Sequence, residues 1–360
     1  MKRIYFLLLS LLFLFEAVHA QFKRVDIPGS EQRTLHSVIV NQDYELQILL
    51  PGGHANSNKI YPVVYLLDSQ WDFPLVKSLY GQQYYDGFIP ELIIVGITWG
   101  GTNPNPDSLR ARDYTPTKEA RLPQSGGAAN FLSFMQKELF PFIEINYKAD
   151  KQHRTLMGCS LGGLMTLYAL FTATDLFEGY VAASPAYGWD RAVIYEYEQK
   201  WFEKNVTSPA RLYMTIGDVE RGLPGYERLA NHLLKRPQTT LSIQSKILEN
   251  TGHSGTKAEG FSRGLQYVFE KPSLKLDEQL LRKYSGTYTL ADGSNVELKT
   301  ENDRLVIYLN GNNRFQLYAN SNSDLYAKNE FMNLHFTVNG EIVEGFQLNR
   351  YGNSQFAKKK

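Results

Sequence analysis

The feature that most constrains the fold is the segment 158–163, which reads Gly-Cys-Ser-Leu-Gly-Gly. A β-rich run precedes it, and an apolar run with helical spacing, residues 161–171, follows it. A sharp strand-to-helix turn brings neighbouring backbone close together, so it requires small residues two positions to either side of its central serine. The glycines of this segment meet the requirement. The pattern therefore predicts a nucleophile elbow with Ser160 at its tip.

Residues 36–270 alternate short β-rich runs with helical stretches, which is typical of a mostly parallel sheet covered by helices on both faces. Continuous apolar runs suit strands that are buried on both sides. Such runs occupy residues 63–67, 92–97, 180–183 and 212–216. Helical spacing is found in residues 128–145, 161–171 and 256–270, and residues 36–50 are expected to form an antiparallel pair with a turn at 41–43. The sequence predicts the α/β class.

After residue 272 the sequence pattern changes to short segments of alternating apolar and polar residues, separated by turn residues. These segments are residues 284–290, 296–300, 305–309 and 314–318. Turn signals at such short spacing indicate a small antiparallel β-barrel or β-sandwich. We place the boundary near Ser273, which gives an α/β domain over 21–273 and a C-terminal β-module over 274–360.

The first twenty residues have the pattern of a signal peptide. Lys2 and Arg3 precede an apolar run over 4–15, and small residues near Ala20 provide a cleavage site. A membrane-spanning helix needs roughly 18 or more apolar residues, and this run is shorter. No cysteine stands directly after this run, which argues against a lipid anchor. We expect residues 1–20 to be removed and the protein to be exported, either to the periplasm or to the medium.

The charge balance and the cysteine content argue against nucleic-acid partners, membrane insertion and disulfide bonds. The chain has 38 Lys and Arg against 37 Asp and Glu, and they are scattered. We therefore expect no nucleic-acid binding and no membrane insertion. The basic tail 358–360 is interpreted as a solvated terminus. The single cysteine, Cys159, excludes an intrachain disulfide and is expected to be a small buried filler rather than a second nucleophile.

A serine hydroxyl becomes a useful nucleophile only with a base in reach and a carboxylate that orients the base. In folds with a nucleophile elbow, the chain order is serine, acid, histidine. His253 follows the strand-like run 240–248 and has Gly252 and Gly255 beside it, which leaves the imidazole room. The other histidines lie before Ser160, within a helical run or in the β-module. His253 is the predicted general base.

Two carboxylates compete for the role of the acid. Asp218 and Glu220 both follow the strand-like run 212–216, where this fold places its acid. Either of them can also be a helix N-terminal carboxylate that the helix dipole stabilises. Spacing alone does not separate the two.

An oxyanion hole needs two preorganised hydrogen-bond donors. The backbone N–H of Leu161, directly after the nucleophile, is the first candidate. The second is expected in the loop after the third strand. Gln70 is our choice there, with Ser69 and Trp71 as alternatives.

Three aromatic residues are candidates for the wall of an acyl or aryl pocket. Tyr114, Tyr187 and Trp189 suit an ester substrate, because such pockets are mostly apolar with few polar groups. Core packing explains each of them equally well, since aromatic side chains bury large areas in any domain of this size.

Residues 36–270 resemble the esterase family of α/β hydrolases that includes enterochelin esterases, feruloyl esterase modules, esterase D-like enzymes and mycolyltransferases. The resemblance rests on residues 61–68, 110–116, 158–163 and 183–185. It implies the α/β-hydrolase fold, hydrolysis of a small-molecule ester through an acyl-enzyme on Ser160, and no metal or organic cofactor. Family members often carry an acidic residue three positions after the glycine that ends the acid strand. That residue is Glu220 here, with Asp218 in reserve.

The resemblance leaves the substrate open. Siderophore esterases of the group tend to have a serine and a tryptophan after the Ser-Pro pair, whereas residues 186–189 read Ala-Tyr-Gly-Trp. Siderophore, feruloyl and sugar esters all remain candidates. One alternative function is an acyltransferase with the same triad, which products formed with competing acceptors would reveal. Another is a non-catalytic protein that binds a glycan or a partner, in which Ser160 would not react with a fluorophosphonate.

Overall fold

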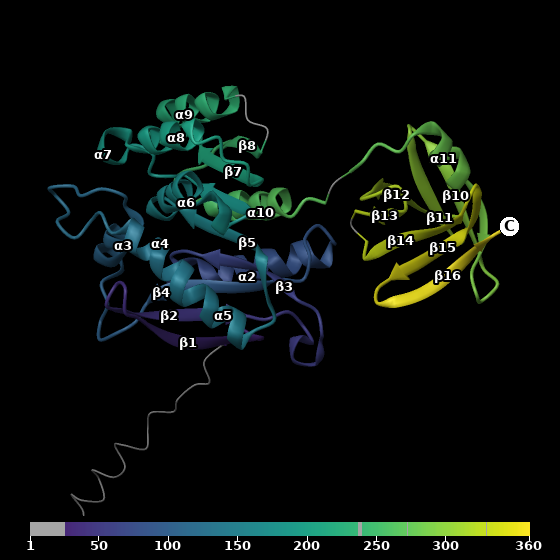
Figure 1. Ribbon diagram of the computed structural model, residues 1–360, viewed down its shortest axis with the longest axis horizontal. Coiled ribbons are helices and arrows are strands. Elements are labelled where there is room, and N and C mark those ends of the chain that lie inside the picture. Colours follow the sequence, from purple (N-terminus) through teal and green to yellow (C-terminus); the bar gives the residue numbers. More distant parts are fainter. Residues whose placement is uncertain (1–25, 237–239, 272, 329) are drawn as a thin grey trace, which may run out of the picture.

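The computed structural model describes residues 26–360, apart from 237–239, 272 and 329. It contains an α/β unit, in which the strands and helices lie between residues 30 and 268, and a β-barrel unit between residues 278 and 359 (Figure 1). The predicted change of architecture near Ser273 falls between them. The predicted signal peptide, residues 1–20, lies outside the described residues.

The sheet of the α/β unit has eight strands in the order β1-β2-β4-β3-β5-β6-β7-β8. β2 is antiparallel to both of its neighbours, β1 and β4, and the remaining neighbours are parallel. The strands are β1 Ser30–Ser37, β2 Gln42–Leu49, β3 Tyr61–Leu66, β4 Ile93–Trp99, β5 Ala149–Cys159, β6 Gly179–Ala183, β7 Ala210–Gly217 and β8 Leu241–Leu248. This is the arrangement of an α/β hydrolase, so the predicted fold class is confirmed.

The antiparallel pair at the start of the sheet differs from the prediction in its bounds. β1 begins at Ser30, six residues before the predicted start, and the turn occupies residues 38–41. Gln42 and Asp43, predicted to lie in the turn, pair with β1 as the first residues of β2. β1 is an edge strand with mostly exposed side chains, so its own sequence has little of the apolar pattern that marks a strand.

Helices cover both faces of the sheet. α6 packs on β5 and β6 together with α3, α4 and α8, whereas α2 and α10 cover the opposite face. The helices are α2 Ser69–Tyr85, α3 Pro106–Tyr114, α4 Ala128–Phe134, α5 Phe140–Asn146, α6 Leu161–Thr172, α7 Trp189–Ala192, α8 Ile194–Glu203, α9 Leu223–Lys235 and α10 Thr256–Val268. The predicted helix 128–145 is interrupted by a π-helical turn, Met135–Leu139, next to Pro141, which has no N–H to donate to the helix ladder.

Side chains along β3 alternate between two buried cores. Val63 and Tyr65 join the core under α6, and Val64 and Leu66 join the core under α2 and α10. A strand that is buried on both faces reads as an unbroken apolar run, as the sequence predicted for β3, β4, β6 and β7. The central strands therefore give rigid support to the loops at their carboxyl ends.

The second unit is a closed antiparallel barrel, so the predicted β-module is a barrel and not a sandwich. Helix α11, Glu278–Tyr284, precedes its eight strands, which are β9 Gly286–Thr289, β10 Asn295–Glu301, β11 Arg304–Leu309, β12 Asn313–Ala319, β13 Asp324–Ala327, β14 Met332–Asn339, β15 Ile342–Arg350 and β16 Asn353–Lys359. Apolar side chains fill the interior. For example, Tyr284 at the end of α11 stacks on Phe336 at 3.9 Å between ring centroids.

The basic tail is not the solvated terminus that its composition suggested. Lys358 and Lys359 belong to β16, which pairs with β15 on one side and with β9 on the other. Lys359 also donates a hydrogen bond from Nζ to the Lys283 carbonyl oxygen. Composition indicated a polar terminus, but backbone pairing decides its place in the barrel.

The α/β unit and the barrel contact each other at several residues. The ring of Tyr84 lies 5.1 Å from that of Phe331, and Lys328 Nζ lies 3.9 Å from a carboxylate oxygen of Glu270. A cavity of about 750 Å³ lies beside these contacts. In the described part of the chain, the helices are all too short or too polar to cross a lipid bilayer.

Candidate active site

Ser160 occupies the turn between β5 and α6 with φ 60° and ψ −117°. A positive φ is strained for a residue other than glycine, and such strain is common at functional turns. A Cβ on Gly158 would lie 2.6 Å from the Gly162 carbonyl oxygen, and a Cβ on Gly162 would lie 3.2 Å from Asp68 Oδ2. The crowding that the sequence predicted around Ser160 is therefore present.

His253 lies in the loop between β8 and α10, opposite the carboxylate of Glu220. Its Nδ1 is 2.7 Å from Glu220 Oε2. The histidine side chain is 51% exposed and the glutamate side chain 11% exposed. The buried carboxylate thus holds one ring nitrogen, and Nε2 remains for a second partner.

Two further groups hold the Glu220 carboxylate in place. Its Oε1 accepts hydrogen bonds from Ser184 Oγ at 2.6 Å and from the Gly217 N–H at 2.9 Å. Burial alone would raise the pKa of Glu220, but these two bonds and the contact with His253 outweigh burial, so the pKa lies below its usual value. Glu220 is therefore ionised at neutral pH.

Asp218, the other candidate acid, has a different set of contacts. Its carboxylate accepts hydrogen bonds from the N–H groups of Asn250 at 3.0 Å and Thr251 at 3.1 Å. These bonds lower the pKa of Asp218. The structure places Glu220 against His253, whereas Asp218 accepts hydrogen bonds from the loop that carries His253.

Ser160 and His253 lie on loops that meet through a chain of hydrogen bonds. The Ser160 N–H donates to the Ala183 carbonyl oxygen at 3.0 Å. The next residue, Ser184, has its Oγ 2.9 Å from Thr256 Oγ1, which donates to the His253 carbonyl oxygen at 2.7 Å. Within the ranges that the structure describes, no hydrogen bond joins Ser160 Oγ to His253 directly.

Sequence reasoning did not assign a role to Ser184 or Thr256. Ser184 stands in the Ala-Ser-Pro segment 183–185, which carried part of the family resemblance, so that segment was an available signal. Its contact with Glu220 joins residues 36 positions apart. Thr256 gave no signal, because a threonine at the start of a helix is common.

The candidate oxyanion donors are amides at the start of two helices. Leu161 is the first residue of α6, and Ser69 and Gln70 are the first two residues of α2. N–H groups in a first helical turn have no acceptor within the helix, and the described residues supply none to these three. The Gln70 side-chain amide is also without a partner there. Trp71, the other alternative, has a 49% exposed side chain.

The three aromatic candidates have different environments. Tyr114 is fully buried, and its hydroxyl accepts a hydrogen bond from the Asp68 N–H at 3.3 Å, so it is a core residue. Tyr187 and Trp189 are half-buried. The Tyr187 hydroxyl donates to the Gly222 carbonyl oxygen at 2.5 Å, and Trp189 Nε1 donates to Thr117 at 3.2 Å. These contacts hold the Tyr187 ring against the segment after β7 and the Trp189 ring against the segment after α3.

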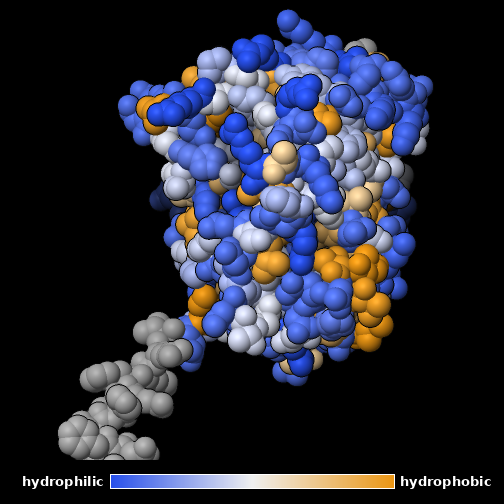
Figure 2. Space-filling view, turned by 90° about the vertical axis from the view of Figure 1, so that its left-hand side faces the viewer, coloured by the Kyte–Doolittle hydropathy of each residue, from blue (hydrophilic) through white to orange (hydrophobic). Residues whose placement is uncertain are grey.

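Helices α3 and α7, which follow the carboxyl ends of β4 and β6, lie at the left of Figure 1. Figure 2 turns this side toward the viewer and shows a mostly hydrophilic surface with separate apolar patches. No group of three or more His, Cys, Asp or Glu side chains in the described ranges is arranged to hold a metal ion.

Cys159, the neighbour of Ser160, is buried behind the turn. Its side chain is 3% exposed, and burial raises the pKa of its thiol to about 12. A thiol with these properties is protonated and inaccessible at neutral pH, as expected of a small core residue.

Comparisons with known proteins relate the α/β unit to esterases. Residues 37–240 match the model of a family described as "Putative esterase". Ferri-bacillibactin esterase BesA of Bacillus subtilis is 32% identical over 210 residues, which cover 54% of this chain and 72% of that protein. The crystal structure of the BES protein from Bacillus cereus superposes with a TM-score of 0.64 at 26% identity, covering 69% of this chain and 99% of that one. An IroE-like serine hydrolase from Shewanella oneidensis has a TM-score of 0.59 at 29% identity, covering 67% and 80%.

Proposed function

Because this chain belongs to the "Putative esterase" family and is a carboxylic ester hydrolase, we propose that Ser160, His253 and Glu220 are its catalytic triad. The observation that carries the proposal is the 2.7 Å contact between His253 Nδ1 and the buried Glu220 carboxylate. It orients Nε2 as a base, in a loop linked by hydrogen bonds to the strained turn of Ser160.

In the proposed reaction, Ser160 Oγ attacks the ester carbonyl carbon while His253 Nε2 takes the hydroxyl proton. The carbonyl electron pair moves to the oxygen, which accepts hydrogen bonds from Leu161 N–H and a backbone N–H at the start of α2. The intermediate collapses, and the departing alcohol takes the proton from His253. Water then attacks the acyl carbon while His253 Nε2 takes one of its protons. The bond from the acyl carbon to Ser160 Oγ breaks, Oγ recovers the proton from His253, and the carboxylic acid leaves.

Glu220 keeps Nδ1 protonated and stabilises the imidazolium without taking its proton. The hydrogen bond between Ser160 and His253 is expected to form when substrate binds, since such bonds are often long in a free enzyme. The role of Glu220 is supported by its low pKa, which keeps the carboxylate charged throughout the cycle.

For the substrate, we propose a siderophore-type ester. The Bacillus subtilis relative is named as a ferri-bacillibactin esterase. The half-exposed His253 suits a bulky ester, because the base lies at the surface. The residues after the Ser-Pro pair, 186–189, differ from those of siderophore esterases, so feruloyl and acetyl-sugar esters are the comparison substrates. A kcat/KM for a feruloyl or sugar ester well above that for a siderophore ester would overturn the substrate proposal.

The triad is tested with purified protein and a short-chain aryl ester. Ser160→Ala and His253→Gln should each lower kcat by at least about 10³-fold, because triad members act as a unit. A fluorophosphonate should label the wild type but not Ser160→Ala. The control is Ser242→Ala, which removes an exposed hydroxyl from β8. Full activity of Ser160→Ala would exclude the mechanism.

We also propose that the protein acts after export, on the strength of the signal-peptide pattern of residues 1–20. Expression of the full chain in a bacterium, followed by fractionation and N-terminal sequencing, should recover a protein that begins near Gln21 outside the cytoplasm. Recovery of uncleaved cytoplasmic protein would contradict export.

A further inference from the structure

A buried ion pair joins α3 to the turn between β3 and α2. Arg110 donates from Nε to Asp68 Oδ1 at 3.1 Å and from Nη2 to Asp68 Oδ2 at 2.8 Å. The side chains are 15% and 2% exposed, respectively. A bidentate pair of this kind fixes orientation as well as distance. Asp68 has a left-handed backbone, φ 55°, directly before the first residue of α2.

The same guanidinium also contacts the turn that carries the nucleophile. Arg110 Nη2 lies 3.4 Å from the carbonyl oxygen of Cys159, the residue before Ser160. The Asp68 carboxylate in turn lies against the first turn of α6, since a Cβ on Gly162 would come within 3.2 Å of its Oδ2. One arginine thus connects the turn after β3 with the turn after β5.

These two turns hold the amides that the proposed mechanism uses. Leu161 N–H belongs to the turn after β5, and the N–H groups of Ser69 and Gln70 belong to the turn after β3. The Asp68 N–H is already used, because it donates to the hydroxyl of Tyr114 at 3.3 Å. Tyr114 lies on α3 like Arg110, so one helix contacts Asp68 through both its carboxylate and its backbone.

We propose that Arg110 is a positioning residue that aligns the oxyanion hole by holding these two turns at a fixed separation. The inference rests on the proposed function, since it assumes an oxyanion between the two turns. Donors of this kind accelerate a reaction because they are already aimed at the developing charge. A misplacement of about 1 Å is enough to cost 10²-fold in rate. Arg110 acts through the backbone and exchanges no proton.

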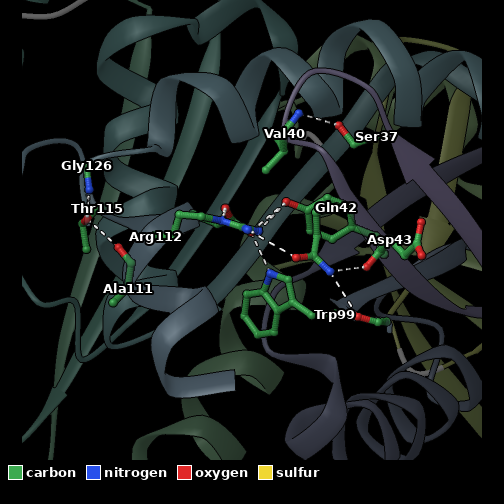
Figure 3. A network of polar contacts seen from close by, with 12 residues as sticks. Ser37, Val40, Gln42, Asp43, Trp99, Ala111, Arg112, Thr115 and Gly126 are labelled. Atoms are coloured by element: carbon green, nitrogen blue, oxygen red, sulfur yellow. Dashed lines mark hydrogen bonds and ion pairs between the residues drawn. The ribbon is translucent and has the colours of Figure 1, made fainter. Parts of the chain in front are cut away.

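The neighbouring pair Arg112–Asp113 provides a matched control on the same helix. Arg112 donates to the buried Asp113 carboxylate at 2.7 and 3.0 Å, and to Gln42 on β2 at 3.2 Å. Figure 3 shows Arg112 extending toward Gln42 and Trp99. Among the described residues, the Arg112 side chain has no hydrogen bond or ion pair with Asp68 or Cys159. Its removal should cost stability without disturbing the oxyanion hole.

The test compares Arg110→Gln, Asp68→Asn, the double variant and Arg112→Gln in the full chain. The readouts are kcat and KM for a short-chain aryl ester, inhibition by an arylboronic acid that forms a tetrahedral anion on serine, and the melting temperature. Arg110→Gln and Asp68→Asn should each lower kcat by about 10- to 100-fold, with KM almost unchanged. Boronate affinity should fall by a similar factor.

The double variant should lose no more activity than the worse single variant, because one interaction is removed in each case. Arg112→Gln should melt at a lower temperature and keep its kcat and its boronate affinity. Arg110→Lys keeps the positive charge but loses the bidentate geometry of the guanidinium, so it should recover part of the activity. It replaces Arg110→Gln in the test if Arg110→Gln fails to fold.

Wild-type kcat in Arg110→Gln would overturn the inference. If Arg110→Gln fails to fold, wild-type kcat in both single variants Arg110→Lys and Asp68→Asn would overturn it. An equal loss in Arg112→Gln, or a loss confined to KM, would overturn it as well. Activity in Ser160→Ala would instead overturn the proposed function, so the two failures are distinguishable.

Discussion

Gly217, at the end of β7, lies against the backbone of Thr251 so closely that a Cβ on the glycine would come within 1.9 Å of the threonine carbonyl oxygen. The end of the acid strand is therefore pressed against the loop that carries His253. Gly217→Ala should displace this loop, lowering kcat for an aryl ester and destabilising the fold by about 1–3 kcal/mol. Steady-state kinetics measures the loss of kcat, and urea unfolding measures the loss of stability.

Gly81→Ala is the control for this substitution. Gly81 lies on the exposed face of α2, and a Cβ there has no neighbour within 4 Å. Alanine in a helix interior is favoured over glycine by about 0.5–1 kcal/mol, so this variant should be slightly more stable and fully active. A Gly217→Ala variant as stable and as active as wild type would show that the loop has room to move.

Substitution of the two carboxylates distinguishes their roles. Glu220→Gln should lower kcat by about 10²- to 10⁴-fold, because the amide no longer holds the imidazole in the correct tautomer. Asp218→Asn should lower kcat by no more than about tenfold, since it weakens only the hydrogen bonds to Asn250 and Thr251. The reverse order of the two effects would assign the acid to Asp218.

The low pKa of Glu220 predicts a pH dependence of stability. Its usual pKa is 4.5, and the folded value is lower. The unfolded chain therefore takes up the proton first, so the contribution of Glu220 is fully present above about pH 4.5 and is lost as pH falls through the folded pKa. The difference in unfolding free energy between wild type and Glu220→Gln should shrink as pH falls from 6 to 3, as measured by urea denaturation.

Ser184→Ala should reduce that difference at neutral pH. The substitution removes the 2.6 Å hydrogen bond to Glu220, which is the largest of the contacts that lower the pKa of this carboxyl. A loss of about 1.5–3 kcal/mol is typical for a hydrogen bond to a charged group. Unfolding curves of the wild type, both single variants and the double variant give the coupling; additive effects would contradict the assigned contact.

Cys159 should be inert in the folded enzyme. With its thiol buried and its pKa raised to about 12, iodoacetamide at pH 8 should modify it only after denaturation. Cys159→Ala should keep its aryl esterase activity to within a few-fold. Mass spectrometry counts the modified thiols. Rapid alkylation of the native protein with loss of activity would indicate a reactive cysteine.

The parts of the site that the sequence predicts are those built by local chain geometry. The strand, turn and helix around Ser160 are contiguous, and the glycine requirement is a local steric matter. His253 follows the strand-like run 240–248, which the structure shows as β8. The same holds for the central strands, because burial on both faces leaves an apolar run that can be read without knowledge of partners.

The parts that escaped prediction depend on contacts between distant segments. Spacing did not separate Asp218 from Glu220, and the preference for Glu220 came from the family resemblance; in the fold it is Glu220 that contacts His253. Arg110 meets Asp68 across 42 positions. β1, an edge strand, and β16, which closes the barrel, are both polar, so their pairing partners rather than their composition decide their structure.

Closure of the barrel by β16 has a consequence for how the protein must be made. β9 is only four residues long, and it lies between β10 and β16. A chain cut before residue 353 would lack the seam between its first and last strands, leaving two open edges with unpaired N–H and C=O groups. Such edges recruit strands from other molecules. Translation therefore has to pass β16 before the edges of this unit are paired and protected from self-association.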